Sequence, residues 1–198
     1  MKKKFYIRIF SLLVFSFFLN SCSDKKDAED SSSYFSFDKS KIGIEVADQE
    51  LGIKFNPPAG WDLTPASISK KIESRGSAND SFIYKPTYIF FNGTTGSLLS
   101  VGKVITNDST LSKSSVLNYY KGLISSKHKN DKLSIGKFIN SKIAFTQFEI
   151  RKENLLSFKI IFENRNREII QFDYTIRQNS FDKSESVIKA SIGSIRNL

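Results

Sequence analysis

Three apolar-patterned segments near the end of the chain constrain the fold most. They occupy residues 143–151, 155–163 and 167–176, and each connector between them is three polar residues ending in Asn. Alternating apolar residues in segments of this length predict β-strands, and short connectors predict antiparallel neighbours. Asn tolerates the left-handed backbone that often closes a three-residue hairpin loop. The sequence therefore predicts a three-stranded antiparallel meander.

The register of this meander decides which side chains share a face. Three-residue loops would place Arg151 opposite Leu155 and Glu163 opposite Arg167. One face would then carry Thr146, Phe148, Ile150, Phe158, Ile160, Phe162, Ile170, Phe172, Tyr174 and Ile176. A slip of one residue would set these side chains opposite polar ones, so the pattern favours this register and predicts a core on this face.

The reverse face combines an apolar row, which predicts a second layer over one end, with polar rows. The polar rows would carry Gln147, Lys159, Gln171, Glu149, Ser157 and Asp173. In this register Glu149 and Asp173 approach across one strand, as a carboxylate pair for acid–base catalysis would. Because Lys159 would lie diagonal to both and neutralise them, we expect ion pairs on a solvated face rather than a catalytic pair.

Further strands are predicted from the same alternation. Runs at residues 42–46 and 51–55 predict a hairpin, and runs at residues 84–91 and 97–106 predict two strands joined by a turn-rich connection. The sheet should have six to eight antiparallel strands.

Three helices are expected from caps and 3.6-residue periodicity. Counted with their capping residues they cover residues 64–76, 108–127 and about 180–196. Thr64 and Ser180 are the N-caps of the first and third, Asp108 or Ser109 is the cap of the second, and Gly76 follows the end of the first. Helices flanking an antiparallel sheet define an α+β layered domain.

Residues 51–61 read Leu-Gly-Ile-Lys-Phe-Asn-Pro-Pro-Ala-Gly-Trp, which resembles the strand, Pro and Gly-Trp entry of the PsbP-like family. This is the fold of the extrinsic photosystem II subunit and of a Ran-binding nuclear import factor. The order of elements that follows is similar too, so the resemblance covers residues 40–198. It implies an α/β/α sandwich but little about activity, because the family is not enzymatic as a class. Neither photosystem binding nor Ran binding transfers to this chain, and no functional residue can be carried over.

The first 22 residues predict export and a lipid anchor. Four basic residues precede an uncharged apolar run that is shorter than the ~20 residues of a membrane-spanning helix. The run ends in Leu19-Asn20-Ser21-Cys22, which resembles the lipobox of bacterial lipoproteins. The resemblance implies removal of residues 1–21, a thioether-linked diacylglycerol on Cys22, and a fatty acid such as palmitate on the new amino terminus. Ser23 is not the Asp that signals inner-membrane retention in enterobacterial lipoproteins, which favours the outer membrane.

The net charge of +10 divides unevenly along the chain. Residues 22–40, a Ser-rich tether with three Lys and five acidic residues, cannot bury enough surface to fold alone. As a flexible chain these residues would span on the order of 25 Å. Residues 41–198, the expected single domain, carry 23 basic and 15 acidic residues, a net charge of +8. The domain is the basic part.

The sequence offers little catalytic chemistry. One Cys and one His allow no intrachain disulfide and no thiolate zinc site, and His128 lies among lysines that would repel metal ions. Neither G-x-S-x-G, a P-loop nor G-x-G-x-x-G occurs. We therefore expect no cofactor, no metal and no enzymatic activity, and we expect Trp61 to fill a sheet edge rather than to stack on a sugar.

Basic residues suggest a binding surface. Five lysines close in sequence would flank an edge, and two arginines would lie at a hairpin tip: Lys127, Lys129, Lys132, Lys137 and Lys142, with Arg165 and Arg167. They would meet an anionic envelope lipid or protein, although basic surfaces also serve solubility alone. Nucleic acid is disfavoured because export removes the chain from it. The leading hypothesis is a non-catalytic envelope lipoprotein with a binding or accessory domain. A hydrolase using the carboxylate pair, or a surface lipoprotein contacting host molecules, remains an alternative.

Overall fold

The computed structural model describes two antiparallel sheets and two α-helices within residues 38–65, 81–108 and 112–198. Cys22, the signal segment and nearly all of the expected tether lie outside the described residues. So does the helix expected at residues 64–76, apart from its first two positions.

The larger sheet has seven strands in the order β3-β4-β5-β9-β8-β7-β6, and every neighbouring pair is antiparallel. Its strands are β3 (Asp62–Leu63), β4 (Phe82–Asn92), β5 (Ser97–Thr106), β6 (Lys132–Asn140), β7 (Ile143–Lys152), β8 (Leu155–Glu163) and β9 (Ile169–Arg177). This sheet confirms the expected α+β class and the expected number of strands.

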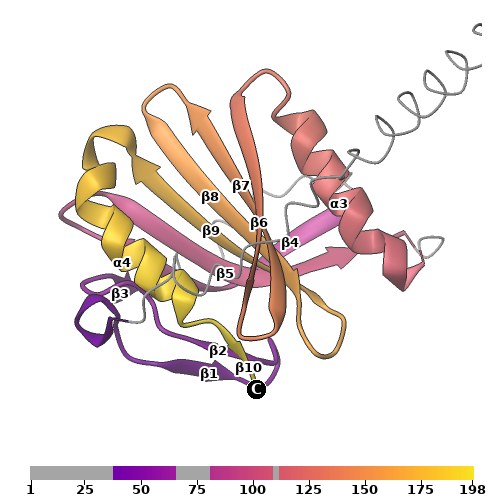
Figure 1. Ribbon diagram of the computed structural model, residues 1–198, viewed down its shortest axis with the longest axis horizontal. Helices are drawn as coiled ribbons and strands as arrows, with labels where there is room; N and C mark the ends of the chain where they lie inside the picture. Colours follow the sequence, from indigo (N-terminus) through magenta and orange to yellow (C-terminus); the bar gives the residue numbers. More distant parts are fainter. Residues whose placement is uncertain (1–37, 66–80, 109–111) are drawn as a thin grey trace, which may run out of the picture.

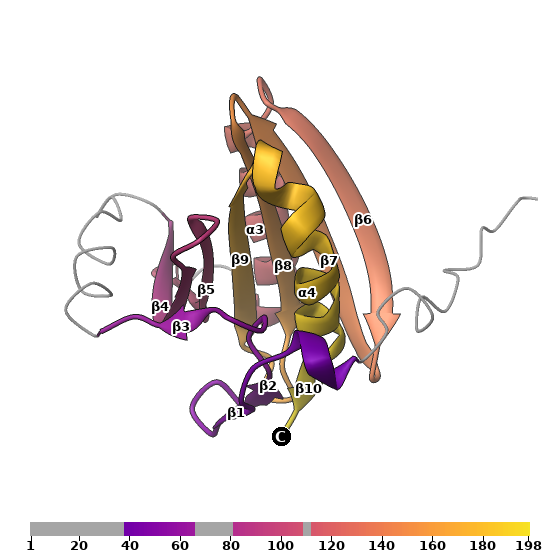
Figure 2. The ribbon, with the colours of Figure 1, turned by 90° about the vertical axis from the view of Figure 1, so that its left-hand side faces the viewer.

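A three-stranded sheet and the helices cover the two faces of the large sheet (Figures 1 and 2). The small sheet consists of β1 (Val46–Asp48), β2 (Ile53–Phe55) and β10 (Arg196–Asn197), and the helical elements are η3 (Lys39–Lys41), α3 (Lys113–Lys127), η4 (Gln178–Ser180) and α4 (Phe181–Gly193). Figure 2 shows α4 and the small sheet on one side of β8 and β9 and α3 on the other. We call these sides the α4 face and the α3 face.

Each face is covered because each buries its own apolar cluster. On the α4 face, Phe55 of β2 packs edge-on against Phe172 with ring centroids 5.0 Å apart, and Ile192 of α4 joins the same cluster. On the α3 face, Ile124 of α3 packs with Phe148 and other apolar side chains in a second cluster. A sheet buried on both faces is the α/β/α sandwich that the family resemblance implied.

Most of the expected strands are confirmed. Val46 pairs with Phe55 in the β1–β2 hairpin, and β4 and β5 cover the two runs predicted around a turn at residues 93–96. The small sheet as a separate layer was not predicted. Neither was β6, because its residues expose most of their side chains and carry no clear alternation.

The helices α3 and α4 each match the prediction at one end and differ from it at the other. The second helix ends at Lys127 as predicted but begins at Lys113, with Ser112 rather than Asp108 at its N-cap. The last helix begins after Ser180 as predicted but ends at Gly193, because Arg196 and Asn197 pair with β2 instead of extending the helix.

The predicted register between β7 and β8 is wrong by one residue. Lys152 pairs with Leu155, and Arg151 pairs with Leu156, because the connection is a two-residue turn in which Glu153, not Asn154, has a positive φ of 50°. The shift moves Thr146, Phe148 and Ile150 to the α3 face, away from Phe158, Ile160 and Phe162.

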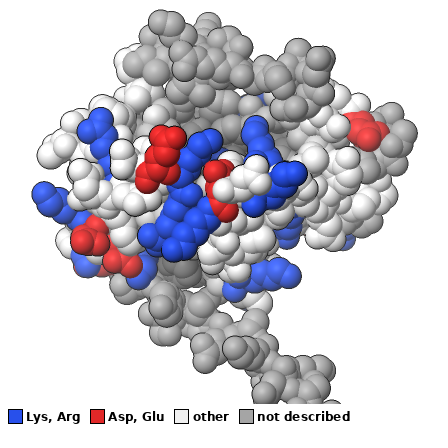
Figure 3. Space-filling view, turned by 90° about the horizontal axis from the view of Figure 1, so that it is seen from above, with Lys and Arg blue, Asp and Glu red and all other residues white. Residues whose placement is uncertain are grey.

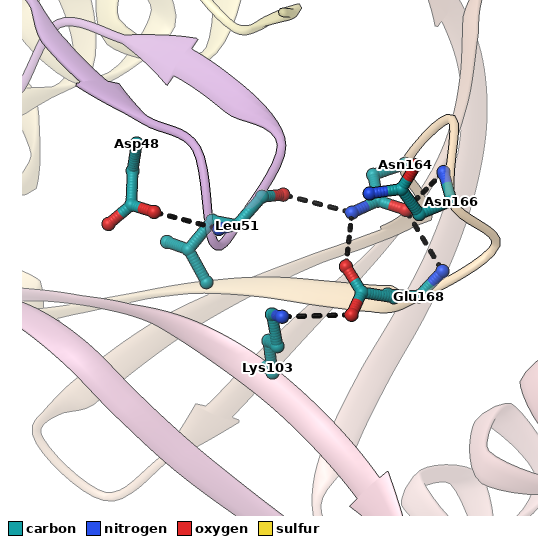
Figure 4. Close-up of polar contacts among 6 residues, drawn as sticks. All are labelled: Asp48, Leu51, Lys103, Asn164, Asn166 and Glu168. Atoms are coloured by element: carbon teal, nitrogen blue, oxygen red, sulfur yellow. Dashed lines mark hydrogen bonds and ion pairs between the residues drawn. The ribbon is translucent and has the colours of Figure 1, made fainter.

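The predicted register between β8 and β9 is wrong by two residues, which leaves the faces unchanged. Glu163 pairs with Ile169 rather than with Arg167, whose φ is 59°. The five-residue connection forms around the buried Asn164, whose side-chain oxygen accepts hydrogen bonds from the backbone N–H groups of Asn166 and Glu168, both at 2.9 Å (Figure 4). A polar side chain that closes its own loop makes the longer connection possible.

Candidate interaction surface

The residues predicted to form one polar surface lie on two opposite faces. Lys159, Gln171 and Asp173 project on the α3 face, whereas Gln147 and Glu149 project on the α4 face. Glu149 therefore cannot approach Asp173, and the carboxylate pair expected from the sequence is wrong. The cause is the one-residue register shift at the β7–β8 turn, which reverses the direction of every side chain on β7 relative to β8.

Asp173 is neutralised by its neighbours in the sheet. It lies directly opposite Lys159 in the β8–β9 ladder and forms an ion pair with the Lys159 ammonium. The Ser157 hydroxyl donates a hydrogen bond of 2.8 Å to its other oxygen. Both side chains are about four-fifths buried, at 18% and 20% exposure. An aspartate with both oxygens bonded has a structural role. Lys159 neutralises Asp173 as expected, although it lies directly opposite Asp173 rather than diagonal to it.

Two tyrosines beside this ion pair are held neutral. Burial, with a smaller contribution from the charge of Asp173, raises the pKa of Tyr84 and of Tyr120 well above the usual value. The Tyr120 hydroxyl donates a 2.7 Å hydrogen bond to Gln171, and the Tyr84 hydroxyl lies 2.8 Å from that of Ser100. Neither phenol is a ready base, so this cluster joins α3 to the sheet rather than performing chemistry.

Glu149 is likewise paired. The Arg151 guanidinium donates to one Glu149 oxygen through Nε at 2.7 Å and Nη2 at 2.6 Å. Gln147 is half-buried two residues earlier on the same face of β7. None of the polar sheet residues predicted from the sequence thus presents an unpaired charge among the described residues.

Unpaired positive charge gathers instead at the end of the sheet where α3 leads into β6. Lys127 ends α3, Lys129 follows in the turn, and Lys132 begins β6, where it lies beside the end of β7 that carries Lys152. All four lysines are exposed, and none has a carboxylate within 4 Å in the part of the chain that the structure describes. We call these four residues the basic corner.

Two acidic residues close to the corner in sequence are already bound, whereas the exposed Glu153, next to Lys152, has no cation within 4 Å in the described part of the chain. The Asp131 carboxylate accepts a 2.7 Å hydrogen bond from Nδ1 of the His128 ring, and Glu149 is held by Arg151. Figure 3 looks down on this end of the molecule and shows Lys and Arg side chains gathered at its centre with single Asp and Glu side chains between them. Positive charge at this end of the molecule is therefore interrupted by acidic side chains rather than forming a continuous patch.

A shallow hollow lies at the same end of the sheet. It has a volume of about 410 Å³ and is lined by Asn154, Leu155, Arg177, Gln178 and Asn179, all exposed. It contains none of Glu149, Asp173 and Gln171, which a hydrolase built on the predicted carboxylates would need. Nor does its lining include a nucleophile with an adjacent base.

The described residues hold no cluster of three or more His, Cys, Asp or Glu side chains suited to a metal ion. Among the same residues, no helix has the length and apolar character needed to cross a bilayer.

The sheet covered by α3 on one face and by α4 with a small sheet on the other has the PsbP-like fold. The chain is similar to the solution structure of cyanobacterial PsbP (CyanoP) from Synechocystis sp. PCC 6803, with a TM-score of 0.50 and 14% identity over 80% of this chain and 94% of that chain. At this identity the likeness shows the fold alone. No protein-family model matches the sequence, and the sequence comparison with curated proteins finds no match.

Sequence reasoning found three of the four corner lysines but missed Lys152 and the strand that connects them. The sequence pattern places Lys152 in a loop, whereas it is the last residue of β7. The signal that indicates β6 is the Ser141-Lys142 turn, because a two-residue connection between Asn140 and Ile143 implies a hairpin partner on the outer side of β7.

Proposed function

We propose that this chain is a bacterial envelope lipoprotein, anchored through acyl chains on Cys22, and that its domain at residues 41–198 is a non-catalytic accessory module. The module binds the acidic surface of another envelope protein through the basic corner. The observation that carries the proposal is the corner itself, where Lys127, Lys129, Lys132 and Lys152 are exposed without a carboxylate partner in the described part of the chain. Unpaired lysines that face acidic residues across an interface give electrostatic complementarity, and the attraction between the opposite charges speeds association.

The position of the corner favours a protein over the headgroups of the anchoring membrane. The described chain begins at Asp38 and enters η3 at the lower end of the molecule in Figures 1 and 2, whereas the connection from α3 to β6 lies at the upper end. A domain attached to the membrane through its amino-terminal end would present the basic corner away from the lipid. Binding to acidic headgroups would require the domain to turn over on its tether.

The anchor is tested by changing the acceptor thiol. Cys22→Ala removes the only Cys in the chain. Because the thiol that accepts the lipid is gone, the variant should incorporate no labelled palmitate and its signal segment should not be cleaved. Ser21→Ala should still be labelled and cleaved. Two or three acyl chains hold a protein on a bilayer where one does not. A Cys22→Ala protein that is still cleaved and labelled would contradict the anchor.

The corner is tested by removing its charge without changing its shape. A triple variant, Lys127→Gln, Lys129→Gln and Lys132→Gln, should lose at least about tenfold in affinity for the protein captured by crosslinking in intact envelopes, and wild-type binding should weaken as salt rises. The matched control replaces the three exposed lysines Lys39, Lys85 and Lys183 with Gln, which removes the same charge elsewhere.

Equal capture by the two triple variants would remove the basic corner from the proposal. Binding of the wild-type chain to vesicles of acidic lipid, lost in the corner variant, would instead identify lipid headgroups as the partner and overturn the preference for a protein.

A further inference from the structure

Among the described residues, the outer edge of β6 is the long strand edge of the large sheet that has neither a Pro nor a β-bulge, and lysine is its one protection against pairing. At the opposite edge, β4 carries Pro86 and a register shift between Pro86 and Tyr88, and β3 covers its far end. In contrast, β6 pairs with β7 without interruption from Lys132 to Asn140 and contains no Pro. An uninterrupted, exposed edge is a template for a further strand.

The turn between β6 and β7 fixes which backbone groups face outward. Ser141 and Lys142 have φ values of 51° and 65°, the two positive values of a type I′ turn, so the flanking Asn140 and Ile143 form a hydrogen-bonded pair. Because hydrogen-bonded and non-hydrogen-bonded pairs alternate along an antiparallel ladder, the N–H and C=O groups of Ile135, Lys137 and Ile139 point away from β7.

The side chains of the same three residues form an unusual edge. They project on the α3 face, where Ile135 is 50% exposed and Ile139 is 48% exposed, with the exposed Lys137 between them. Half-exposed isoleucines on both sides of a lysine offer apolar contacts that a neighbouring strand would cover. The lysine opposes pairing with any strand that brings another positive charge to this position.

The charge of the edge selects among possible occupants. Residues 132–142 contain three Lys and no Asp or Glu. A second copy of this chain pairing through β6 would set lysines against lysines, which destabilises a ladder. A strand with an acidic residue opposite Lys137 and an apolar residue two positions to either side would form an ion pair flanked by two apolar contacts.

We propose that β6 binds an extended acidic segment of a partner protein by strand addition, with the partner pattern apolar-x-acidic-x-apolar opposite Ile135, Lys137 and Ile139. The inference rests on the proposed function, because it describes how an acidic protein that docks at the basic corner continues along the strand that begins at Lys132. Backbone hydrogen bonds would supply affinity, and the alternating side chains would supply specificity.

The test uses the full chain purified in detergent and a nine-residue peptide with Glu at its centre, Val two residues to either side and Thr elsewhere. Adding the peptide should slow amide hydrogen exchange at Ile135, Lys137 and Ile139, and the same peptide with Lys at its centre should not. Ile135→Pro removes one outward N–H and no ladder bond, so it should weaken binding about tenfold, whereas Ile135→Thr retains the donor and should bind within about twofold.

A charge exchange keeps the test decisive if the Pro variant unfolds. Lys137→Glu should bind the Lys-centred peptide and lose the Glu-centred one. The inference is overturned if the Glu-centred peptide protects no outward amide of β6, or if Ile135→Pro binds it as tightly as wild type. In either case, continued loss of the captured protein in the corner triple variant would leave the proposed function standing, whereas retention of that protein would remove both.

Discussion

Asn164 shows how one buried polar side chain can connect three parts of this fold. Its amide nitrogen donates to the Leu51 carbonyl at 2.9 Å and to Glu168 at 2.8 Å, and its oxygen closes the β8–β9 connection (Figure 4). Glu168 in turn receives a 2.8 Å bond from Lys103 of β5. Although burial acts to raise it, these hydrogen bonds hold the pKa of Glu168 below its usual value. The cluster therefore fastens the small sheet to the large one.

Replacing Asn164 should destabilise the protein more than replacing its neighbour. Asn164→Ala leaves the buried Leu51 carbonyl and two backbone N–H groups without partners, which should cost roughly 2–3 kcal/mol in the free energy of unfolding. Asn166→Ala, in the same loop but exposed, should change it by less than about 0.5 kcal/mol. Urea unfolding of the two variants measures the difference, and coincident midpoints would show that the Asn164 bonds contribute little.

At the scale of elements, the registers of β7, β8 and β9 explain what the sequence could and could not predict. Alternation located all three strands, because each has apolar residues every second position. It failed to align β7, because β7 buries apolar side chains on both of its faces. Phe148 and Phe158 are both buried but on opposite faces. When both faces are covered, a slip of one residue exchanges one apolar row for another, and the pattern no longer resolves it.

The conformation of the two connecting turns decides the register instead, and the residues with positive φ were predicted wrongly. Asn at the end of each connector suggested a left-handed residue there, whereas Glu153 and Arg167 adopt that conformation. The same dependence on register decides which residues of the candidate site could be predicted. The positions of Lys127, Lys129 and Lys132 needed only the order of the elements and could be predicted. Whether Glu149 meets Asp173 depends on the register, and the predicted pair is wrong.

At the scale of the whole molecule, the separation between the basic corner and the point where the described chain begins matters most. The chain enters at η3 beneath α4, and the basic corner, the shallow hollow and the start of β6 lie at the other end of the sheet (Figures 1 and 2). The nine residues of β9 span this distance, about 30 Å at the rise of an extended strand. The proposed lipid anchor at Cys22 and the proposed partner at the corner would thus not compete for the same surface.

This separation predicts an orientation on the membrane. Once Cys22 is acylated, a Cys introduced at Lys39 or at Asn179 is the one thiol available for a fluorescent donor, since the chain has a single native Cys. Lys39 lies in η3, near the point where the described chain begins, whereas Asn179 borders the hollow at the far end. Energy transfer to an acceptor on lipid headgroups should therefore be stronger from Lys39→Cys than from Asn179→Cys in reconstituted vesicles. Equal transfer, or stronger transfer from Asn179→Cys, would mean that the domain turns its basic corner to the bilayer, which would assign the corner to anionic lipid rather than to a protein.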